Sequence, residues 1–192
     1  MKDIVLIGGG GHCKAVIDVV EQEGLFNIIG IIDKPEMLGT NLLEYQIIGD
    51  DSELINVVKS CHNALITIGQ IKNPSPRIKL FNKLLELGFK LPTIISPRAY
   101  ISKHSSIGIG SIIMHDAIIN ADVVIGKNCI INTKSLVEHG SNIGNHCHIS
   151  TNAVINGEVI VGEGSFIGSG SVTKECIRID NNFFAKAGSV IK

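Results

Sequence analysis

Residues 99–168 decide the fold, and they read AYISKHSSIGIGSIIMHDAIINADVVIGKNCIINTKSLVEHGSNIGNHCHISTNAVINGEVIVGEGSFIG. Every sixth residue is Ile or Val over twelve consecutive positions: Ile101, Ile107, Ile113, Ile119, Ile125, Ile131, Val137, Ile143, Ile149, Ile155, Val161 and Ile167. The residue two places before each of them is small, namely Ala, Ser, Cys or Val. A six-residue period fits neither an α-helix nor an alternating strand, and it is typical of a β-solenoid in which three hexapeptides form one coil.

The repeat predicts where each residue type lies in a coil. The aliphatic residue is expected to point into a narrow axis and to stack on its copies in the coils above and below. The residue two places earlier is expected at the inner side of a corner, where only a small side chain fits. Glycine follows the aliphatic residue at 18-residue intervals, at Gly108, Gly126, Gly144 and Gly162, as expected if one coil contains three hexapeptides.

The first 92 residues follow a different pattern, in which short apolar runs alternate with helical segments. We expect strands over 3–7, 27–33 and 64–69, and helices after the glycines at 8–11, over 52–60 and over 76–87. Such alternation implies a parallel sheet covered by helices. The sequence therefore predicts two domains, a Rossmann-like α/β domain over 1–92 and an all-β parallel solenoid over 93–192.

Composition excludes several classes of protein. The 192 residues carry 17 Lys and Arg against 18 Asp and Glu, so the net charge of −1 gives no electrostatic reason to bind nucleic acid or an anionic membrane. No apolar run approaches the ~18 residues of a membrane span, and the N-terminal apolar stretch is too short for a signal peptide. Five cysteines without a CxxC pair argue against a disulfide framework and a four-cysteine zinc site. We expect a cytoplasmic protein without membrane insertion or nucleic-acid partner.

Three motifs together resemble one family. The chain opens with IVLIGGGGHCKAVIDVV (4–20), and its repeats contain NTKSLVEH (132–139) and HCHIS (146–150). This combination resembles the bacterial sugar O-acyltransferase family of hexapeptide-repeat acyltransferases, over nearly the whole chain. That family includes sialic-acid O-acetyltransferases and N-acetyltransferases of nucleotide-linked 4-amino-4,6-dideoxy sugars. The resemblance implies a left-handed parallel β-helix, a homotrimer with active sites between neighbouring β-helices, and acetyl-CoA as co-substrate.

The Glu138-His139 pair is the candidate catalytic element. His139 follows the inward Val137 by two residues, so it is expected to project from the surface of a coil. A neutral imidazole can take up a proton near neutral pH, and the resemblance implies that His139 is the general base. The family commonly has an acidic residue after this histidine, whereas this chain has Gly140. Either Glu138 or another group then orients the ring, or the base is weaker than usual. Glu138 has the alternative interpretation of an outward-facing charge.

The resemblance also implies the coenzyme and acceptor residues in the repeats. His148, Gly157 and Ser169 correspond to positions that contact acetyl-CoA in the family, and Asn132 is a candidate for the acceptor pocket. Gly157 is equally explained as a corner residue. The neighbouring His146 is expected to be exposed to solvent.

The glycine run Gly8–Gly11 follows a strand and opens a helix, which is the context in which backbone N–H groups bind phosphate. It does not match the G-x-G-x-x-G spacing, and the chain lacks the second half of a dinucleotide fold, so NAD is not expected. The resemblance implies a nucleotide-sugar site formed by residues of this loop and of the next strand ends: Gly10, Gly11, His12, Asp33, Lys34 and Gly69. Asp33 has the alternative interpretation of a helix or turn cap.

These observations predict an acetyl-CoA-dependent N-acetyltransferase that acts on a nucleotide-linked 4-amino-4,6-dideoxy sugar by direct transfer, because no cysteine or serine stands beside His139 as an acyl carrier. The close alternative is O-acetylation of a sialic-acid-like sugar. A non-catalytic nucleotide-sugar-binding protein is an alternative of another class, supported by Gly140. A metal-dependent hydratase is disfavoured, because His139, His146 and His148 lack the spacing of a three-ligand zinc site, and we expect no metal.

Overall fold

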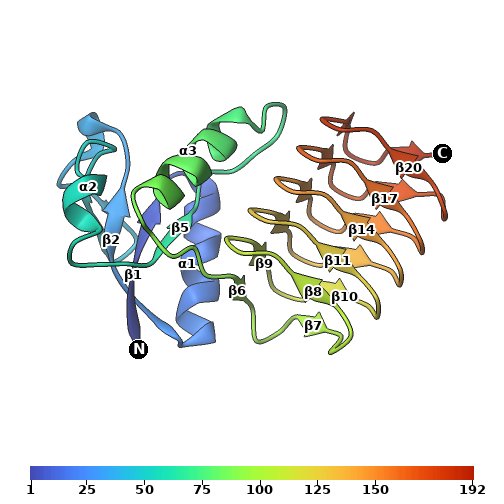
Figure 1. Cartoon of the computed structure of the whole chain (residues 1–192), viewed down its shortest axis with the longest axis horizontal. Helices are drawn as coiled ribbons and strands as arrows, with labels where there is room; N and C mark the ends of the chain where they lie inside the picture. Colours follow the sequence, from blue (N-terminus) through green and yellow to red (C-terminus); the bar gives the residue numbers. More distant parts are fainter. The chain divides into compact units, whose positions relative to one another are not determined.

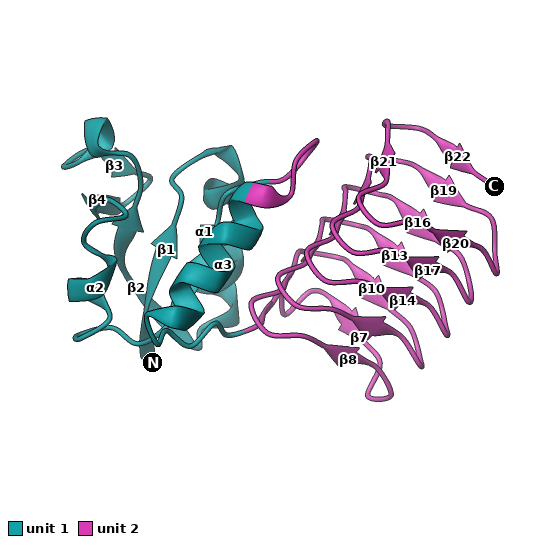
Figure 2. Ribbon diagram, turned by 45° about the horizontal axis from the view of Figure 1, so that its top comes forward, with its two compact units in different colours: residues 1–69, 76–92 teal, residues 70–75, 93–192 magenta.

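The computed structural model describes all residues from 1 to 192. The chain forms two compact units (Figure 2). The first unit contains Met1–Gly69 and Pro76–Pro92, and the second contains Gln70–Ser75 and Thr93–Lys192. The segment 70–75, which the sequence analysis placed in the first domain, belongs to the second unit. None of the helices combines the length and the apolar character that a membrane crossing requires.

The first unit is a five-stranded sheet with helices (Figure 1), and its strand order is β3-β4-β2-β1-β5. The strands are β1 (Lys2–Ile7), β2 (Phe26–Ile32), β3 (Asn41–Leu42), β4 (Tyr45–Gly49) and β5 (Ala64–Ile66). The helices are α1 (Gly11–Glu23), the 3-10 turn η1 (Pro35–Met37), α2 (Leu54–Val57) and α3 (Ser75–Glu86). All pairs are parallel except β3 with β4.

The predicted elements of this unit are confirmed with small shifts at their ends, except that the helix over 52–60 shortens to α2. Helix α1 ends where Gly24 adopts φ 68°, and the Gly24 N–H caps the carbonyl of Val20. The β3–β4 hairpin was not predicted. Burial alternates along β4, but its sequence, Tyr-Gln-Ile-Ile-Gly, does not alternate between apolar and polar residues, and the strand is stabilised by pairing with β2.

The second unit is a parallel β-helix of two-residue strands (Figures 1 and 2). One sheet contains β6 (Ile94–Ile95), β9 (Ile112–Ile113), β12 (Ile130–Ile131), β15 (His148–Ile149), β18 (Phe166–Ile167) and β21 (Phe184–Ala185). The next contains β7 (Tyr100–Ile101), β10 (Ile118–Ile119), β13 (Leu136–Val137), β16 (Val154–Ile155), β19 (Val172–Thr173) and β22 (Val190–Ile191). The third contains β8 (Ser106–Ile107), β11 (Val124–Ile125), β14 (Asn142–Ile143), β17 (Ile160–Val161) and β20 (Arg178–Ile179).

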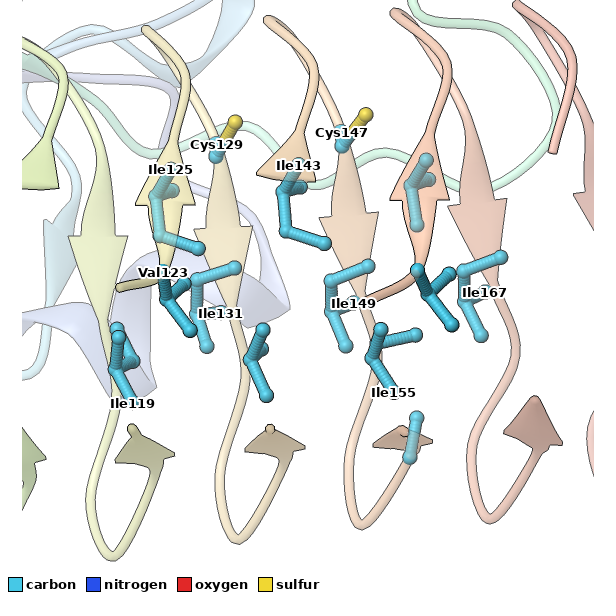
Figure 3. Packing of buried hydrophobic residues seen from close by; sticks show 14 of the residues in the cluster. Ile119, Val123, Ile125, Cys129, Ile131, Ile143, Cys147, Ile149, Ile155 and Ile167 are labelled. Carbon is cyan, nitrogen blue, oxygen red and sulfur yellow. The ribbon is translucent and has the colours of Figure 1, made fainter. Parts of the chain in front are cut away.

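The aliphatic residues of the repeat form the core of the β-helix, as predicted. From Ile113 to Ile167 they are at most 2% exposed, and they stack along the axis (Figure 3). Ile101 and Ile107, in the first coil, are partly buried against the same cluster. Each strand pairs with the strand 18 residues further along the chain, for example Ile131 with Ile149.

The small residues lie at corners where the next coil passes close by. Ser111 Oγ donates to the carbonyl of Gly126 (2.8 Å) and accepts from the N–H of Cys129 (2.9 Å). The Cys129 and Cys147 thiols occupy equivalent positions and donate to backbone carbonyls at 3.2 and 3.1 Å. A larger side chain would displace this backbone, which explains the predicted preference for small residues.

A third six-residue register was not recognised in the sequence. Fourteen residues spaced by six have positive φ: Gly110, Asp116, Asp122, Asn128, Lys134, Gly140, His146, Asn152, Glu158, Gly164, Gly170, Cys176, Asn182 and Gly188. Ten of them are Gly, Asn or Asp, which are the residues that adopt the left-handed conformation most readily. Gly140, the departure from the family pattern, therefore stands at a left-handed corner with φ 66°.

The axial packing predicts the effect of shortening one stacked residue. Ile149→Ala removes a fully buried side chain whose neighbours along the axis are Ile131 and Ile167. We expect the free energy of unfolding to fall by about 2–5 kcal/mol, as measured by denaturant titration. Asn142→Ala, at an exposed position of β14, is the control and is expected to change it by less than about 0.5 kcal/mol. Equal effects of the two substitutions would contradict the axial packing.

Candidate functional site

The glycine run forms the connection between β1 and α1. Gly8 has φ +107°, and a Cβ there would overlap Cγ2 of Ile68. The Gly9 N–H donates to Asp33 Oδ2 (2.8 Å), Gly10 is the N-cap of α1, and Gly11 is its first residue. Gly10 and Gly11 are exposed, and a Cβ added at either would meet no atom within 4 Å. The open N-terminus of α1 is therefore suited to an anionic ligand.

Asp33 holds this loop in place. Its Oδ2 accepts from the N–H of Gly9, and its Oδ1 accepts from the N–H of Lys34, both at 2.8 Å. A Cβ at Gly9 would lie 2.7 Å from Asp33 Oδ2, so the close approach requires glycine. Both carboxylate oxygens thus accept from backbone N–H groups, whereas neither α1 nor η1 has a side-chain cap.

Two cavities open at the carboxyl ends of the parallel strands in this unit. One has a volume of about 660 Å³ and an apolar floor that includes Ile7, Ile32 and Leu80. The other, about 370 Å³, lies along the glycine loop. They share four residues, namely Gly8, Asp33, Lys34 and Ile68. The chain order reverses across β1, and open α/β sheets bind ligands at such a switch point.

The predicted nucleotide-sugar residues gather here. Gly10, Asp33, Lys34 and Gly69 line the smaller cavity, and a Cβ at Gly69 would contact the Cβ of His12 at 3.6 Å. Sequence reasoning missed Lys79 and Lys83 of α3, which line the larger cavity. Their four-residue spacing places them on one face of the helix, which was the available signal. Lys83 pairs with Asp51 at 3.6 Å.

In the second unit, His139 lies at the corner that follows β13 and is exposed, as expected. A Cβ added at Gly157, 18 residues further on, would lie 2.8 Å from Cε1 and 2.9 Å from Nε2 of His139. The imidazole therefore rests on the backbone of Gly157 in the next coil. The structure thus brings together two residues that the sequence analysis singled out separately.

The acidic groups near His139 are held by other partners. Glu138 is half-buried, and its Oε2 accepts from Asn120 Nδ2 at 2.7 Å. The side chain of Glu158, which sequence reasoning missed, occupies the space beside Gly140, since a Cβ at Gly140 would lie 3.2 Å from Glu158 Cγ. Its Oε2 accepts from the thiol of Cys176 at 3.6 Å. Neither carboxylate forms an ion pair with the His139 ring.

His148 is 7% exposed, and both of its ring nitrogens face partners within the second unit. Nδ1 lies 2.6 Å from the carbonyl oxygen of Gln70, which can only accept, so Nδ1 carries a proton. Nε2 lies 3.0 Å from the amide nitrogen of Asn132, whose Oδ1 accepts from the N–H of Thr133, so Nε2 is the acceptor. His148 is therefore the neutral Nδ1–H tautomer, and it anchors the segment 70–75.

His146 and Ser169 lie at other corners of the β-helix. His146 is 8% exposed, which corrects the prediction of an exposed side chain, because Asn128 and the Gln70 amide pack against it. Ser169 is exposed and bonds to Ser150 Oγ at 2.9 Å. Ser169 and Asn132 lie at the corner before the sheet that contains β13, whereas His139 and Gly157 lie at the corner after it. Within a single chain, the corner with Asn132 and Ser169 is therefore separate from the corner with His139 and Gly157.

No three or more His, Cys, Asp or Glu side chains are grouped so that they could hold a metal ion. In particular, His139 lies at one corner, whereas His146 and His148 engage Asn128, Gln70 and Asn132.

Comparisons with known proteins agree with these features. Residues 3–84 match the PglD N-terminal domain, and residues 140–175 match the bacterial transferase hexapeptide family of six repeats. No curated protein sequence matches the chain.

Several solved structures superpose on the whole chain. PerB from Caulobacter crescentus in complex with CoA and GDP-perosamine is 31% identical, with a TM-score of 0.92, and the two chains are covered to 100% and 89%. A histidine-to-asparagine mutant of perosamine N-acetyltransferase from the same organism, in the same complex, is 30% identical with a TM-score of 0.93 and the same coverage. The acetyltransferase domain of PglB from Neisseria gonorrhoeae is 29% identical, with a TM-score of 0.91 and coverage of 100% and 92%.

An α/β domain followed by a left-handed parallel β-helix of hexapeptide repeats is the architecture of a hexapeptide acyltransferase. The chain belongs to the bacterial sugar O-acyltransferase family, and it is an acetyltransferase. The predicted fold class and family are thereby confirmed, and the alternative of a non-catalytic binding protein is set aside.

The His148 geometry predicts a local change in dynamics. His148→Phe keeps a ring against Phe166 (centroids 5.1 Å apart) but removes the bonds to Gln70 and Asn132. Because one hydrogen bond contributes about 0.5–1.5 kcal/mol, amide exchange within 70–75 should accelerate by up to about tenfold. Hydrogen exchange followed by mass spectrometry measures this, with His104→Phe, at an exposed corner, as the control. Unchanged protection in 70–75 would contradict the anchoring role.

Proposed function

We propose that this protein transfers the acetyl group of acetyl-CoA directly to the amino group of a nucleotide-linked 4-amino-4,6-dideoxy sugar, with His139 as general base. The observation that carries the proposal is the exposed His139 imidazole seated on Gly157. The relatives with CoA and GDP-perosamine bound support the co-substrate and the substrate class. In this proposal the first unit binds the nucleotide sugar, the second carries the transferase site, and the enzyme is cytoplasmic, as the sequence predicts.

The chemistry needs a proton acceptor and a stabiliser of negative charge. When an amine attacks a thioester carbonyl, its nitrogen gains positive charge and must lose a proton, which the exposed ring of His139 can accept. The carbonyl oxygen gains negative charge at the same time. The backbone N–H of Gly157 makes no hydrogen bond within the chain, so it is available to donate to that oxygen.

Direct transfer is favoured because no nucleophile is available to carry the acetyl group. The thiolate is the reactive form of cysteine. Burial raises the pKa of the Cys13 thiol to about 11 and raises that of Cys147 further. Cys61 and Cys129 are also buried, and Cys176 donates to Glu158.

The acetyl-CoA face, in this proposal, includes Gly157 and Ser169, which solvent reaches at least in part. His148 has both ring nitrogens engaged, so it supports the site by orienting Asn132, the candidate residue of the acceptor pocket. Glu138 is restrained by Asn120 and contributes negative charge next to the base.

A homotrimer would complete this site. The sheet that contains β13 has an apolar outer column in which Leu136 and Val154 are half-buried. The other members are exposed: Tyr100 (58%), Ile118, Val172 and Val190 (69%). A contiguous exposed apolar surface is typical of an interface. The corners on its two sides differ, so a head-to-tail contact between copies joins unlike corners, and such a contact forms a ring when the rotation between copies closes. It would bring the Asn132 corner of one copy to the His139 corner of the next.

The nucleotide sugar is assigned to the two cavities of the first unit. The N-terminus of α1 and the exposed glycines provide N–H groups and a positive dipole end for the diphosphate. The larger cavity offers the apolar floor that a nucleobase requires, with Lys79 and Lys83 at its edge. A panel of guanine, uracil and thymine nucleotides identifies the base.

Release of the CoA thiol tests the reaction and the base. The assay combines acetyl-CoA with GDP-, UDP- and dTDP-linked 4-amino-4,6-dideoxy sugars, and we expect turnover with at least one. His139→Ala should lower kcat by about 10²–10⁴, whereas His104→Ala should leave it unchanged. Turnover that survives His139→Ala would refute the base assignment. Turnover with a sialic-acid-like sugar alone would replace N-acetylation by O-acetylation.

The role of Asp33 predicts a selective loss of nucleotide-sugar affinity. Asp33→Ala frees the N–H groups of Gly9 and Lys34, so the glycine loop loses its fixed conformation. Hydrogen bonds to a charged group contribute about 1.5–3 kcal/mol, so KM for the nucleotide sugar should rise roughly tenfold or more. KM for acetyl-CoA should not change, and Asp3→Ala, near the opposite end of β1, is the control. A parallel rise in both KM values would indicate general misfolding instead.

A further inference from the structure

We propose that Gly157 is a positioning residue, and that its missing side chain is the seat of the His139 imidazole. This inference rests on the proposed function, and it adds a steric role to the backbone contact described above. The glycine holds no ligand in this role. Gly157 lies one coil further along the chain than His139, and the absence of its side chain leaves the space that the His139 ring occupies.

The contacts of Gly157 differ from those of other glycines in the β-helix. At Gly126, Gly144 and Gly162, an added Cβ would run into the backbone of the next coil. For a Cβ added at Gly157, the three nearest atoms all belong to the His139 ring: Cε1 at 2.8 Å, Nε2 at 2.9 Å and Nδ1 at 3.5 Å. Real Cβ atoms essentially never approach within 3.0 Å, so a side chain at 157 and this position of the ring exclude each other.

Backbone conformation gives no reason for glycine at this position. Gly157 lies outside the left-handed region, and the left-handed residue of this corner is Glu158, with φ 59°. By contrast, Gly140 and Gly164 have φ of 66° and 73°. An alanine at 157 is therefore compatible with the coil. The equivalent positions in this column include Ala121 and Glu175, which shows that the column accepts side chains.

The consequence for catalysis follows from the exposure of His139. An exposed side chain exchanges among staggered rotamers, and no hydrogen bond fixes this ring. The ring lies so close to Gly157 that an added methyl group would overlap Cε1 and Nε2, so the missing side chain at 157 is what permits this position of the ring. A methyl group at 157 would push the ring into another rotamer and move Nε2 away. A misplacement of about 1 Å can lower a rate about a hundredfold.

Gly157→Ala tests the proposal. We expect kcat to fall by about a hundredfold, with little change in either KM or in the melting temperature. Glu175→Ala, in the same column one coil further on, is the matched control and should leave kcat unchanged. In the His139→Ala background, Gly157→Ala should have no further effect, because no ring remains to be displaced. If Gly157→Ala lowers kcat by the same factor in the His139→Ala background as in the wild type, the proposal is overturned.

A second measurement does not depend on activity. The NMR resonances of the His139 ring, assigned by their loss in His139→Ala, should shift in Gly157→Ala and stay in place in Glu175→Ala. If the ring shifts but no acetyl transfer is found, the proposed function fails and the positioning role stands. If the ring resonances are unchanged by Gly157→Ala, the positioning role fails, whatever the activity.

Discussion

Each coil of the β-helix is tied to the next by backbone hydrogen bonds between residues about 18 apart, as where Ile130 N–H donates to the carbonyl of Cys147 and Glu138 N–H to that of Ile155. Because this ladder keeps one register, each residue of the β-helix lies next to the residue 18 positions further along the chain. The axial isoleucines stack for this reason, and so the ring of His139 meets the backbone of Gly157.

The same register also keeps some of the candidate functional groups apart. Groups in one column are neighbours, whereas groups at different corners of a coil are kept apart by the sheet between them. Asn132 and His139 are only seven residues apart in sequence, yet they flank opposite sides of β13. In the proposed homotrimer, two neighbouring copies would bring these two corners together. In the first unit the glycine loop is instead fixed by a side chain, because Asp33 Oδ2 accepts from the N–H of Gly9.

Much of this architecture could be predicted from the sequence, and the reasons are local. The inward position of Ile149, the small residue at Ser111 and the exposure of His139 all follow from a six-residue period. The left-handed corners obey the same period, from Gly110 to Gly188, and went unrecognised because Lys, His, Glu and Cys occupy some of them. The β3–β4 hairpin had no comparable signal, since pairing with β2 stabilises it more than its own pattern indicates.

The sequence by itself determined the period, the axial core, the order of the elements of the first unit other than the β3–β4 hairpin, and the identity of the candidate base. The tertiary structure decided which groups are free to react. His148 is buried because Gln70, 78 residues earlier, accepts its Nδ1 proton, and Asp33 is engaged because Gly9, 24 residues before it, donates to its carboxylate. Periodicity specifies the environment of a residue along its own strand, but contacts between distant segments depend on how coils and loops pack, and no local pattern encodes them.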